Sequence, residues 1–372
     1  MVVTAATAGT GRLPATAEFR VRVHSANRAV EWTVHRVGRL HRERNLQAGA
    51  PSTFGVTRYR NLLLFLVLAG VWGSAFMAIN AGLKLAGIPP VLFAAVRYDI
   101  AGVLMLGYAA LVLDDPIPRG RGQWALVAVG SFLLIAAYHA FLFVGESDPS
   151  VTSAAAAVIV SLSPILTTVF ARVFLPEERL TVVGVVGLLL GLVGVVVLSD
   201  PNPDRLLTGA VVAKLLIFTA AASFALGSVL TRRIDAEMPI ESMEAWSMLG
   251  GAGIMHVVSA ALGESPAGVD WFSPVALGSL LYLSVGASAV GFLIYFDLLD
   301  RLGPIEINLV SYVAPLSAAL AGWAFLAETP SDATAYGFLL IFVGFVLVKR
   351  RAIREEVAGF RDRRRRTGSS DD

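Results

Sequence analysis

The sequence predicts an all-α integral membrane protein whose ten transmembrane helices form two inverted five-helix repeats. Three observations support this prediction: an apolar composition, ten separate apolar segments and a pattern that occurs twice. Of the 372 residues, 56% are hydrophobic and 16% are charged, and the mean hydropathy is +0.69. Soluble domains carry about 25% charged residues, so most of this chain is expected to lie in a bilayer.

Composition and motifs also exclude several classes of site. The chain has no Cys, which rules out disulfides, thiolate metal sites and Cys nucleophiles. It contains neither an HExxH motif nor the GxxxxGK[ST] motif of ATP-driven proteins, so we expect no metal, no cofactor and no enzyme activity. Basic residues gather at the chain ends beside apolar segments, which indicates a lipid bilayer rather than nucleic acid as their partner.

Ten apolar segments follow the first 60 residues. Each is close to the ~20 residues that cross ~30 Å of hydrocarbon. The loops between them are short, and Gly and Pro are frequent inside them, as membrane helices tolerate. The expected spans are 61–82, 90–112, 123–144, 151–174, 181–199, 208–230, 243–262, 275–297, 306–326 and 333–350.

Arginines predict the orientation of these spans. With the N-terminus in the cytoplasm, the outside loops carry only Lys84 and Arg205. Because five spans per half is an odd number, the second half enters the membrane from the opposite face, and both termini lie inside. The loops and helix ends that fall inside carry Arg119, Arg121, Arg172, Arg179, Arg232, Arg233 and Arg301.

The chain is expected to have four regions. Residues 1–59 form a polar, Arg-rich cytoplasmic tail, 60–200 and 207–350 the two repeats, and 351–372 a basic cytoplasmic tail. The first tail lacks the apolar stretch of a signal peptide. It is expected to be disordered; alternatively, residues 28–46 form a basic helix on the inner leaflet, or a misassigned start codon adds the segment.

A pattern of proline, acid and glycines occurs in both halves. Pro164 precedes Glu177 by 13 residues, and Pro315 precedes Glu328 by 13. Each acid is followed by two glycines seven residues apart, Gly187 and Gly194 in the first copy and Gly337 and Gly344 in the second. A pattern that recurs about 150 residues apart in an apolar chain indicates a duplicated membrane unit.

Further motifs accompany this pattern: Trp72 to Phe76 in the first span, Pro90 to Arg97-Tyr98 in the second, and Arg301-Leu302-Gly303. Together, over about residues 60–350, they resemble the EamA-like members of the drug/metabolite transporter superfamily. The resemblance implies that spans 1–4 and 6–9 surround a central cavity. Three positions depart from the family pattern: Trp246 stands in place of an Arg, Phe224 in place of a Trp, and Lys214 is an unusual charge in the sixth span.

The resemblance also implies a function. The chain is expected to be a gradient-driven secondary transporter that exports a small metabolite, such as an amino acid or organic anion, by alternating access between its repeats. The alternative is a non-transporting membrane scaffold or sensor that uses its basic tails as the interaction surface.

The repeated prolines are the first candidate binding residues. Both lie near mid-membrane, where we expect each to break its helix and free the carbonyl four residues earlier, at Val160 and Ser311. Either these bends line the cavity, or local hydroxyls satisfy ordinary packing kinks. The residues predicted to bind substrate here are Ser163, Pro164, Ser311, Tyr312 and Pro315.

Arg97, Tyr98 and Asp99 are the second candidates. Arg97 and Asp99 are ~200° apart around a helix, so their side chains should point to opposite sides. We predict that Arg97 is a substrate-facing cation, which favours an anionic or zwitterionic substrate; the alternative is a structural ion pair with Asp297 or Glu244.

Other predicted binding residues are Trp72, Phe76, His139 and Trp246. His139 is either a hydrogen-bonded packing residue or a proton relay. Glu244 either faces the cavity or lies at the headgroups, where Trp246 would anchor the helix. Coupling is predicted for Asp99, Glu244 or His139.

A stripe of small residues in the fifth span has two interpretations. It either packs inside the chain or forms the face of a homodimer. The stripe consists of Gly184, Gly187, Gly191 and Gly194.

Overall fold

The computed structural model describes residues 53–174, 182–199, 209–302, 307, 309–347 and 350. The chain divides after Arg58, and every contact below lies within residues 59–372. The predictions for both tails, and for Glu177, Glu178 and Arg179, concern residues outside the described ranges.

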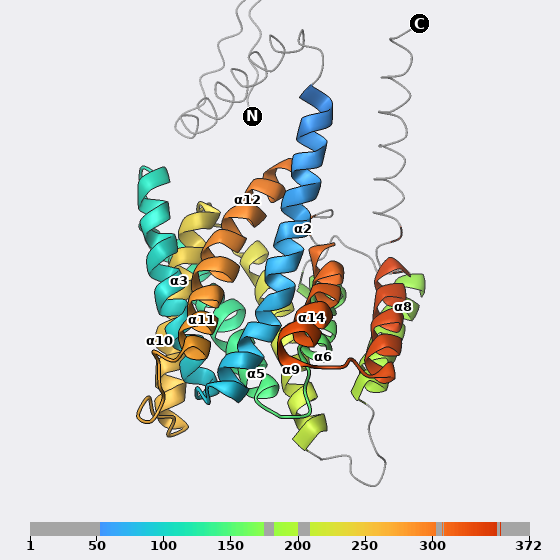
Figure 1. The fold of residues 1–372 in the computed structure, drawn as a ribbon. Helices are drawn as coiled ribbons and strands as arrows, with labels where there is room; N and C mark the ends of the chain where they lie inside the picture. The colour runs from blue at the N-terminus through green and yellow to red at the C-terminus, as the bar shows by residue number, and fades with distance from the viewer. Residues whose placement is uncertain are drawn as a thin grey trace, which may run out of the picture. The chain divides into compact units, whose positions relative to one another are not determined.

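In chain order, with η for π-helical segments, the elements are α2 (Thr53–Asn80), η1 (Ala81–Leu85), α3 (Pro90–Val112), α4 (Gly120–Val129), η2 (Gly130–Ala137), α5 (Tyr138–Glu146), α6 (Ser153–Val160), α7 (Ser163–Phe174), α8 (Val182–Ser199), α9 (Gly209–Arg233), α10 (Ile240–Ala261), α11 (Pro274–Leu281), η4 (Tyr282–Val290), α12 (Gly291–Leu302), α14 (Val310–Leu326) and the helix Asp332–Leu347 (Figure 1).

Several of these helices have membrane-spanning length and composition. Shorter apolar helices cover Val183–Gly194, Val310–Leu326 and Asp332–Leu347. The described residues contain no strand, so this part of the chain is all-helical. The six long apolar helices, some made of joined segments, are Arg60–Leu85, Pro90–Val112, Gly120–Glu146, Ser153–Phe174, Gly209–Arg233 and Pro274–Leu299.

Several helices begin at residues that favour a helix N-terminus. Pro90 and Pro274 occupy the first helical positions of α3 and α11, where proline's missing N–H costs nothing. Thr152 caps α6 by accepting a hydrogen bond from Ala155 N, and Ser273 caps α11 in the same way.

α3 and α10, the second spans of the two halves, run antiparallel along each other. Asp99 contacts His256 near the end of α10, whereas Gly102 packs on Leu249 nearer its start. α6 also packs against α14, so the two proline-bearing spans lie side by side. These pairs join the halves through corresponding elements.

The matched glycines of the two halves meet in a reciprocal pairing. A Cβ on Gly194 would lie 2.8 Å from the Gly337 carbonyl oxygen, and a Cβ on Gly344 would lie 2.5 Å from that of Gly187. α8 and the helix Asp332–Leu347 are therefore antiparallel and in close contact (Figure 1). The glycine stripe packs inside the chain, as the first of its two interpretations predicted; a homodimer stays a prediction and would have to use another face.

The expected break at each proline is found in only one half. A turn at Ser161 and Leu162 separates α6 from α7 just before Pro164, whereas α14 continues through Pro315. The expectation of a broken helix at Pro315 was therefore wrong. Proline removes a single helical hydrogen bond, and α6 and α2 packed along α14 hold the rest of the helix in place.

Candidate functional site

Arg97 places a cation in the protein interior between α3 and η4. Its side chain is 6% exposed, and its Nε and Nη2 donate to Ser288 Oγ over 3.3 and 3.2 Å. Its guanidinium carbon lies 4.9 Å from the centre of the Tyr98 ring. A guanidinium has five N–H donors in a planar fork, so one hydroxyl satisfies only part of it, and the group can receive an anion.

Neither ion pair expected as the alternative for Arg97 is formed. Asp297 accepts instead from Arg60, at 3.2 Å, and from Arg301, at 2.9 Å. Within the described ranges no carboxylate forms an ion pair with Arg97. Glu244 is half-buried on α10 and interacts electrostatically with Tyr98, so it lies in the same interior region without neutralising Arg97 directly.

Trp72 of α2 binds the residue next to Ser288. Its Nε1 donates to the Ala287 carbonyl over 3.0 Å, and its ring stacks on Tyr295 at 5.4 Å between ring centres. A Cβ on Gly291 would lie 2.7 Å from Trp72 Nε1, so only glycine leaves room for the indole. Adjacent residues of η4 thus hold Trp72 and Arg97, which joins the first, second and eighth spans.

The third span of each half carries its π-helical segment near the middle. Wider π turns leave backbone carbonyls open to outside donors, and they are frequent at functional sites. Ser223 of α9 donates to the Leu133 carbonyl of η2 over 2.9 Å, much as Trp72 does to Ala287. In both halves the first span therefore binds the π segment of the other half.

Tyr98 and His139 form a closed hydrogen-bonded pair. His139 Nδ1 lies 2.9 Å from the Ile135 carbonyl oxygen, and Nε2 lies 2.6 Å from the Tyr98 hydroxyl. A carbonyl can only accept, so Nδ1 carries the proton and Nε2 accepts from Tyr98. This arrangement matches the packing role expected for His139, and a proton relay through it would first have to break one of these bonds.

Asp99 points away from Arg97, as their spacing predicts. Its carboxylate lies 2.7 Å from His256 Nε2, and the two side chains are 46% and 42% exposed. The pair joins α3 to α10 at a distance from η4. Phe76, by contrast, is buried in the main hydrophobic core.

The freed carbonyl near Pro164 is satisfied locally. Ser163 Oγ donates to the Val160 carbonyl over 2.8 Å, as expected for a packing kink relieved by serine. Near Pro315, the Tyr312 hydroxyl is buried without a hydrogen-bond partner among the described residues, and Ser311 is half-buried. Among the described residues near the two prolines, the Tyr312 hydroxyl is therefore a polar group that local contacts leave unsatisfied.

Trp246 lies at the start of α10, against the loop after α3. Its Nε1 and Ser242 Oγ both donate to the Pro116 carbonyl, over 2.9 and 2.5 Å. Its ring also packs edge-on against Trp124. We call the contact of Pro116 with Ser242 and Trp246 the Pro116 clamp; it lies apart from η4, at one end of α10.

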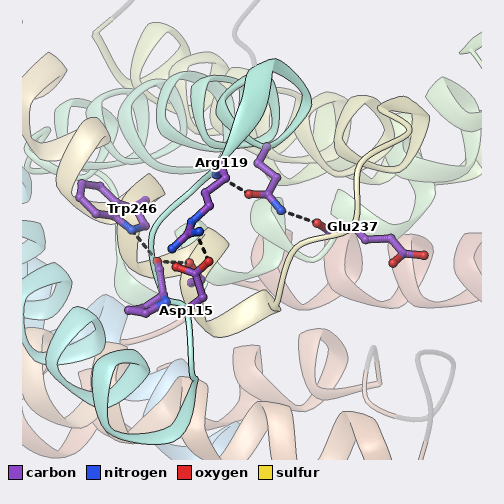
Figure 2. A network of polar contacts seen from close by, with 7 residues as sticks. Asp115, Arg119, Glu237 and Trp246 are labelled. Atoms are coloured by element: carbon purple, nitrogen blue, oxygen red, sulfur yellow. Dashed lines mark hydrogen bonds and ion pairs between the residues drawn. The ribbon is translucent and has the colours of Figure 1, made fainter. Parts of the chain in front are cut away.

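A second set of contacts surrounds the Pro116 clamp (Figure 2). Arg119 pairs with Asp115 at 2.7 Å, and its backbone N–H donates to Gln123 Oε1. Gln123 Nε2 in turn donates to the Glu237 carbonyl over 2.7 Å. The loop 113–119 of the first half is thereby tied to the loop 234–239 of the second.

The opposite end of the α3–α10 pair carries the counterpart. Glu264, in the loop after α10, accepts from Val91 N over 3.1 Å and from Leu92 N over 2.8 Å. These are free N–H groups of the first turn of α3, where a carboxylate is favoured by the helix dipole. We call this contact the Glu264 clamp. In each clamp, the loop that follows the second span of one half binds the start of the second span of the other half.

Comparisons with known proteins agree with this arrangement. A model of the EamA-like transporter family matches residues 60–200 and 212–350. The chain is 28% identical to the uncharacterized transporter YvbV of Bacillus subtilis, over 81% of this chain and 95% of that protein. It is 30% identical to the uncharacterized inner membrane transporter YedA of Escherichia coli, over 78% and 92%. A chain of known crystal structure shares the fold, with a TM-score of 0.55 at 24% identity over 79% and 99%.

The chain belongs to the EamA-like transporter family. Its apolar helices make it a multi-pass membrane protein, and its family and relatives point to a transporter rather than an enzyme. The family match covers the residues that form both clamps and the contacts of η4.

This EamA-like transporter also contains a buried polar group that sequence reasoning missed. Asn80 Nδ2 donates to Ser153 Oγ and to Glu328 Oε1, over 2.9 and 3.1 Å, and Ser153 N donates to Glu328 Oε2 over 2.8 Å. Lys84 Nζ donates nearby to the Val151 carbonyl. We call Asn80, Lys84, Glu146, Ser153 and Glu328 the Glu328 cluster.

The sequence carried a partial signal for this cluster. Glu328 is the repeated acid of the second half, and it lies in the loop after α14. Glu146 follows a long apolar run, a position typical of a loop in the sequence, whereas it ends α5 in the interior.

Proposed function

We propose that this protein is a secondary transporter that moves a small anionic or zwitterionic metabolite, such as an amino acid or organic anion, across the cell membrane. The observation that carries this proposal is Arg97, a buried guanidinium without an ion pair among the described residues. A cation inside a membrane protein costs several kcal/mol unless a partner or a wet cavity compensates it. A carboxylate on the substrate would supply that partner.

The proposed site lies around η4. Arg97 would bind the carboxylate, Ser288 would orient the guanidinium, and Trp72 and Tyr98 would provide adjoining aromatic surface. The adjacent half-buried Glu244 would favour a substrate that also carries an amino group. Export is the direction we propose, in keeping with the family resemblance.

The proposed topology is ten spans with both termini in the cytoplasm. The antiparallel α3–α10 and α8–Asp332–Leu347 pairs support inverted repeats. Arg119, Arg232 and Arg301 lie at the end of the molecule that carries the Pro116 clamp, whereas Lys84 lies at the end with the Glu328 cluster. The positive-inside rule would place the Pro116 clamp in the cytoplasm.

The two clamps provide a mechanism for alternating access. Each joins one half to the other, and they lie at opposite ends of the antiparallel α3–α10 pair. Rocking of one half against the other would break one clamp while the other stays closed. Substrate at η4 would then meet water on one side at a time.

A ligand screen tests the substrate class. Purified protein should be stabilised against heat by some amino acids or organic acids, but not by quaternary ammonium cations. Arg97→Ala should abolish this stabilisation, while Asp99→Asn, two residues away but bonded to His256, should retain it. Differential scanning fluorimetry with each compound measures the shift.

Flux measurements test transport itself. Any stabilising compound should show counterflow in proteoliposomes made with the wild type, and much less with Arg97→Ala. Stabilisation by cations, or ligand shifts that persist in Arg97→Ala, would contradict the substrate class. Stabilisation without counterflow would contradict transport.

A further inference from the structure

Glu146 is a buried carboxyl group that the proposed substrate site does not use. It is the last residue of α5, it is 0% exposed, and neither carboxylate oxygen accepts a hydrogen bond from the described residues. An ionised carboxylate in this position would lack both water and hydrogen-bond donors, at a large cost in free energy. The C-terminal end of a helix further disfavours negative charge.

The neighbouring acid, Glu328, accepts hydrogen bonds through both of its carboxylate oxygens. Its two oxygens accept from the Asn80 amide and from the Ser153 backbone N–H at the start of α6. A helix N-terminus stabilises a carboxylate. The two acids of the Glu328 cluster therefore occupy opposite environments: Glu328 accepts hydrogen bonds, whereas the Glu146 oxygens accept none from the described residues.

Neither Lys84 nor Arg97 forms an ion pair with Glu146 among the described residues. Lys84 of η1 acts on it electrostatically, as does Arg97 of α3 at longer range. Yet Lys84 Nζ donates to the Val151 carbonyl over 2.6 Å, and no ion pair joins Lys84 to Glu146 in the described structure. α9, which packs along α5, carries Lys214 at the level of this end.

We propose that Glu146 is a proton-binding site, neutral in this arrangement and ionised when the Glu328 end of α14 separates from α6. Glu328 belongs to the second half of the chain, whereas Asn80, Glu146 and Ser153 belong to the first. Separation of the halves would expose Glu146 to water. Its O–H bond would then break, the proton would pass to water, and the carboxylate would pair with the Lys84 ammonium.

Proton release would thus accompany opening at the Glu328 cluster. This link to transport rests on the proposed function, but the protonation of Glu146 does not. A substrate flux tied to that opening would be driven by a proton gradient.

Infrared spectroscopy tests the protonation directly. Full-length protein in lipid vesicles at neutral pH should show the carbonyl stretch of a protonated carboxylic acid. Glu146→Gln should remove this band. The control, Asp148→Asn, should retain it, because Asp148 lies two residues away and accepts from Ser150 N over 2.9 Å. A band that persists in Glu146→Gln, or that is absent from the wild type, would overturn the proposal.

Thermal stability provides a second readout. Glutamine resembles a neutral glutamic acid but needs no proton, so Glu146→Gln should be at least as stable as the wild type near neutral pH. The native state holds a proton that the unfolded state has lost, so wild-type stability should fall as pH rises. Glu146→Gln should fall less steeply. A variant that unfolds at neutral pH would indicate a paired carboxylate and would also overturn the proposal.

Flux separates this inference from the proposed function. Vesicles that contain the wild type and a pH-sensitive dye should report proton movement when a substrate that shows counterflow is added. Glu146→Gln should keep counterflow, but its substrate flux should no longer respond to a pH gradient. Gradient-driven flux that survives in Glu146→Gln would overturn the coupling role. Absence of all counterflow in the wild type would contradict the transporter proposal and leave the infrared assignment in place.

Discussion

Two serines of η4 differ in a way that isolates the role of Arg97. Ser284 and Ser288 are both fully buried, but only Ser288 accepts from Arg97, while Ser284 Oγ has no hydrogen-bond partner within the described residues. A hydroxyl that binds a buried guanidinium orients it and shares its charge. The orientation of the Arg97 guanidinium in the proposed anion site should therefore depend on Ser288 and not on Ser284.

Substitution of each serine tests this difference. Ser288→Ala should reduce the free energy of unfolding by about 1.5–3 kcal/mol, since it removes a hydrogen bond to a charged group. Ser284→Ala should be neutral or stabilising, because it removes an unpaired buried hydroxyl. Denaturant titration in mixed micelles measures both. Equal losses in the two variants would show that Ser288 does not hold Arg97.

Sequence reasoning reached part of this picture. Helical geometry separates Arg97 from Asp99 by their spacing alone, and the structure places them on opposite sides of α3. The partner of Arg97 could not be predicted, because Ser288 is 191 residues away and is one of several serines in its span. Glu146 was missed for a related reason: only tertiary packing determines whether a residue at a helix end meets water.

At the scale of elements, α8 and the helix Asp332–Leu347 are in close contact through their glycines. Their glycines pair reciprocally: Gly194 of the first copy contacts Gly337 of the second, and Gly344 of the second contacts Gly187 of the first. Two helices related by a twofold axis in the membrane plane would meet in this way. Small residues let the backbones approach.

A single added methyl group should disturb this contact. Gly194→Ala should cost about 1–3 kcal/mol of unfolding free energy, because its Cβ would lie 2.8 Å from the Gly337 carbonyl oxygen. The control is Gly253→Ala in α10, where nothing lies within 4 Å of an added Cβ. That change should stabilise by about 0.5–1 kcal/mol. Comparable effects of the two substitutions on the denaturation midpoint would rule out the reciprocal packing.

The repeated pattern predicted duplication but not these contacts. Spacing between Gly187 and Gly194 can be read from the sequence, whereas their contact with the last helix depends on how the halves assemble. The prolines show the same limit. Pro164 and Pro315 match in sequence, yet only Pro164 follows a break, because the neighbours of each helix decide whether it continues.

At the scale of the molecule, the halves are joined by exchanged loops. The loop after α3 holds the start of α10, and the loop after α10 holds the start of α3. Helical membrane-spanning segments and duplication could be predicted because apolar runs and repeated motifs are local features. The crossed loops could not, because their contacts involve backbone atoms such as the Pro116 carbonyl, which any residue could supply.

The central claim is that the halves move against each other, and a reversible cross-link at the Pro116 end tests it most directly. The native chain has no Cys, and a Cβ on Gly122 would lie 2.9 Å from Ala236 Cβ, so a small outward shift of the loop 234–239 would bring the pair to the ~3.8 Å typical of disulfides. Gly122→Cys with Ala236→Cys should therefore form a disulfide between the first turn of α4 and the loop 234–239 of the other half. Either single variant is the control.

The measurement is counterflow in proteoliposomes before and after oxidation. Oxidation of the double variant should abolish counterflow, and reduction should restore it, while both single variants remain active under the two conditions. A cross-linked protein that transports as fast as the reduced protein would contradict the claim that the two halves must separate at this end.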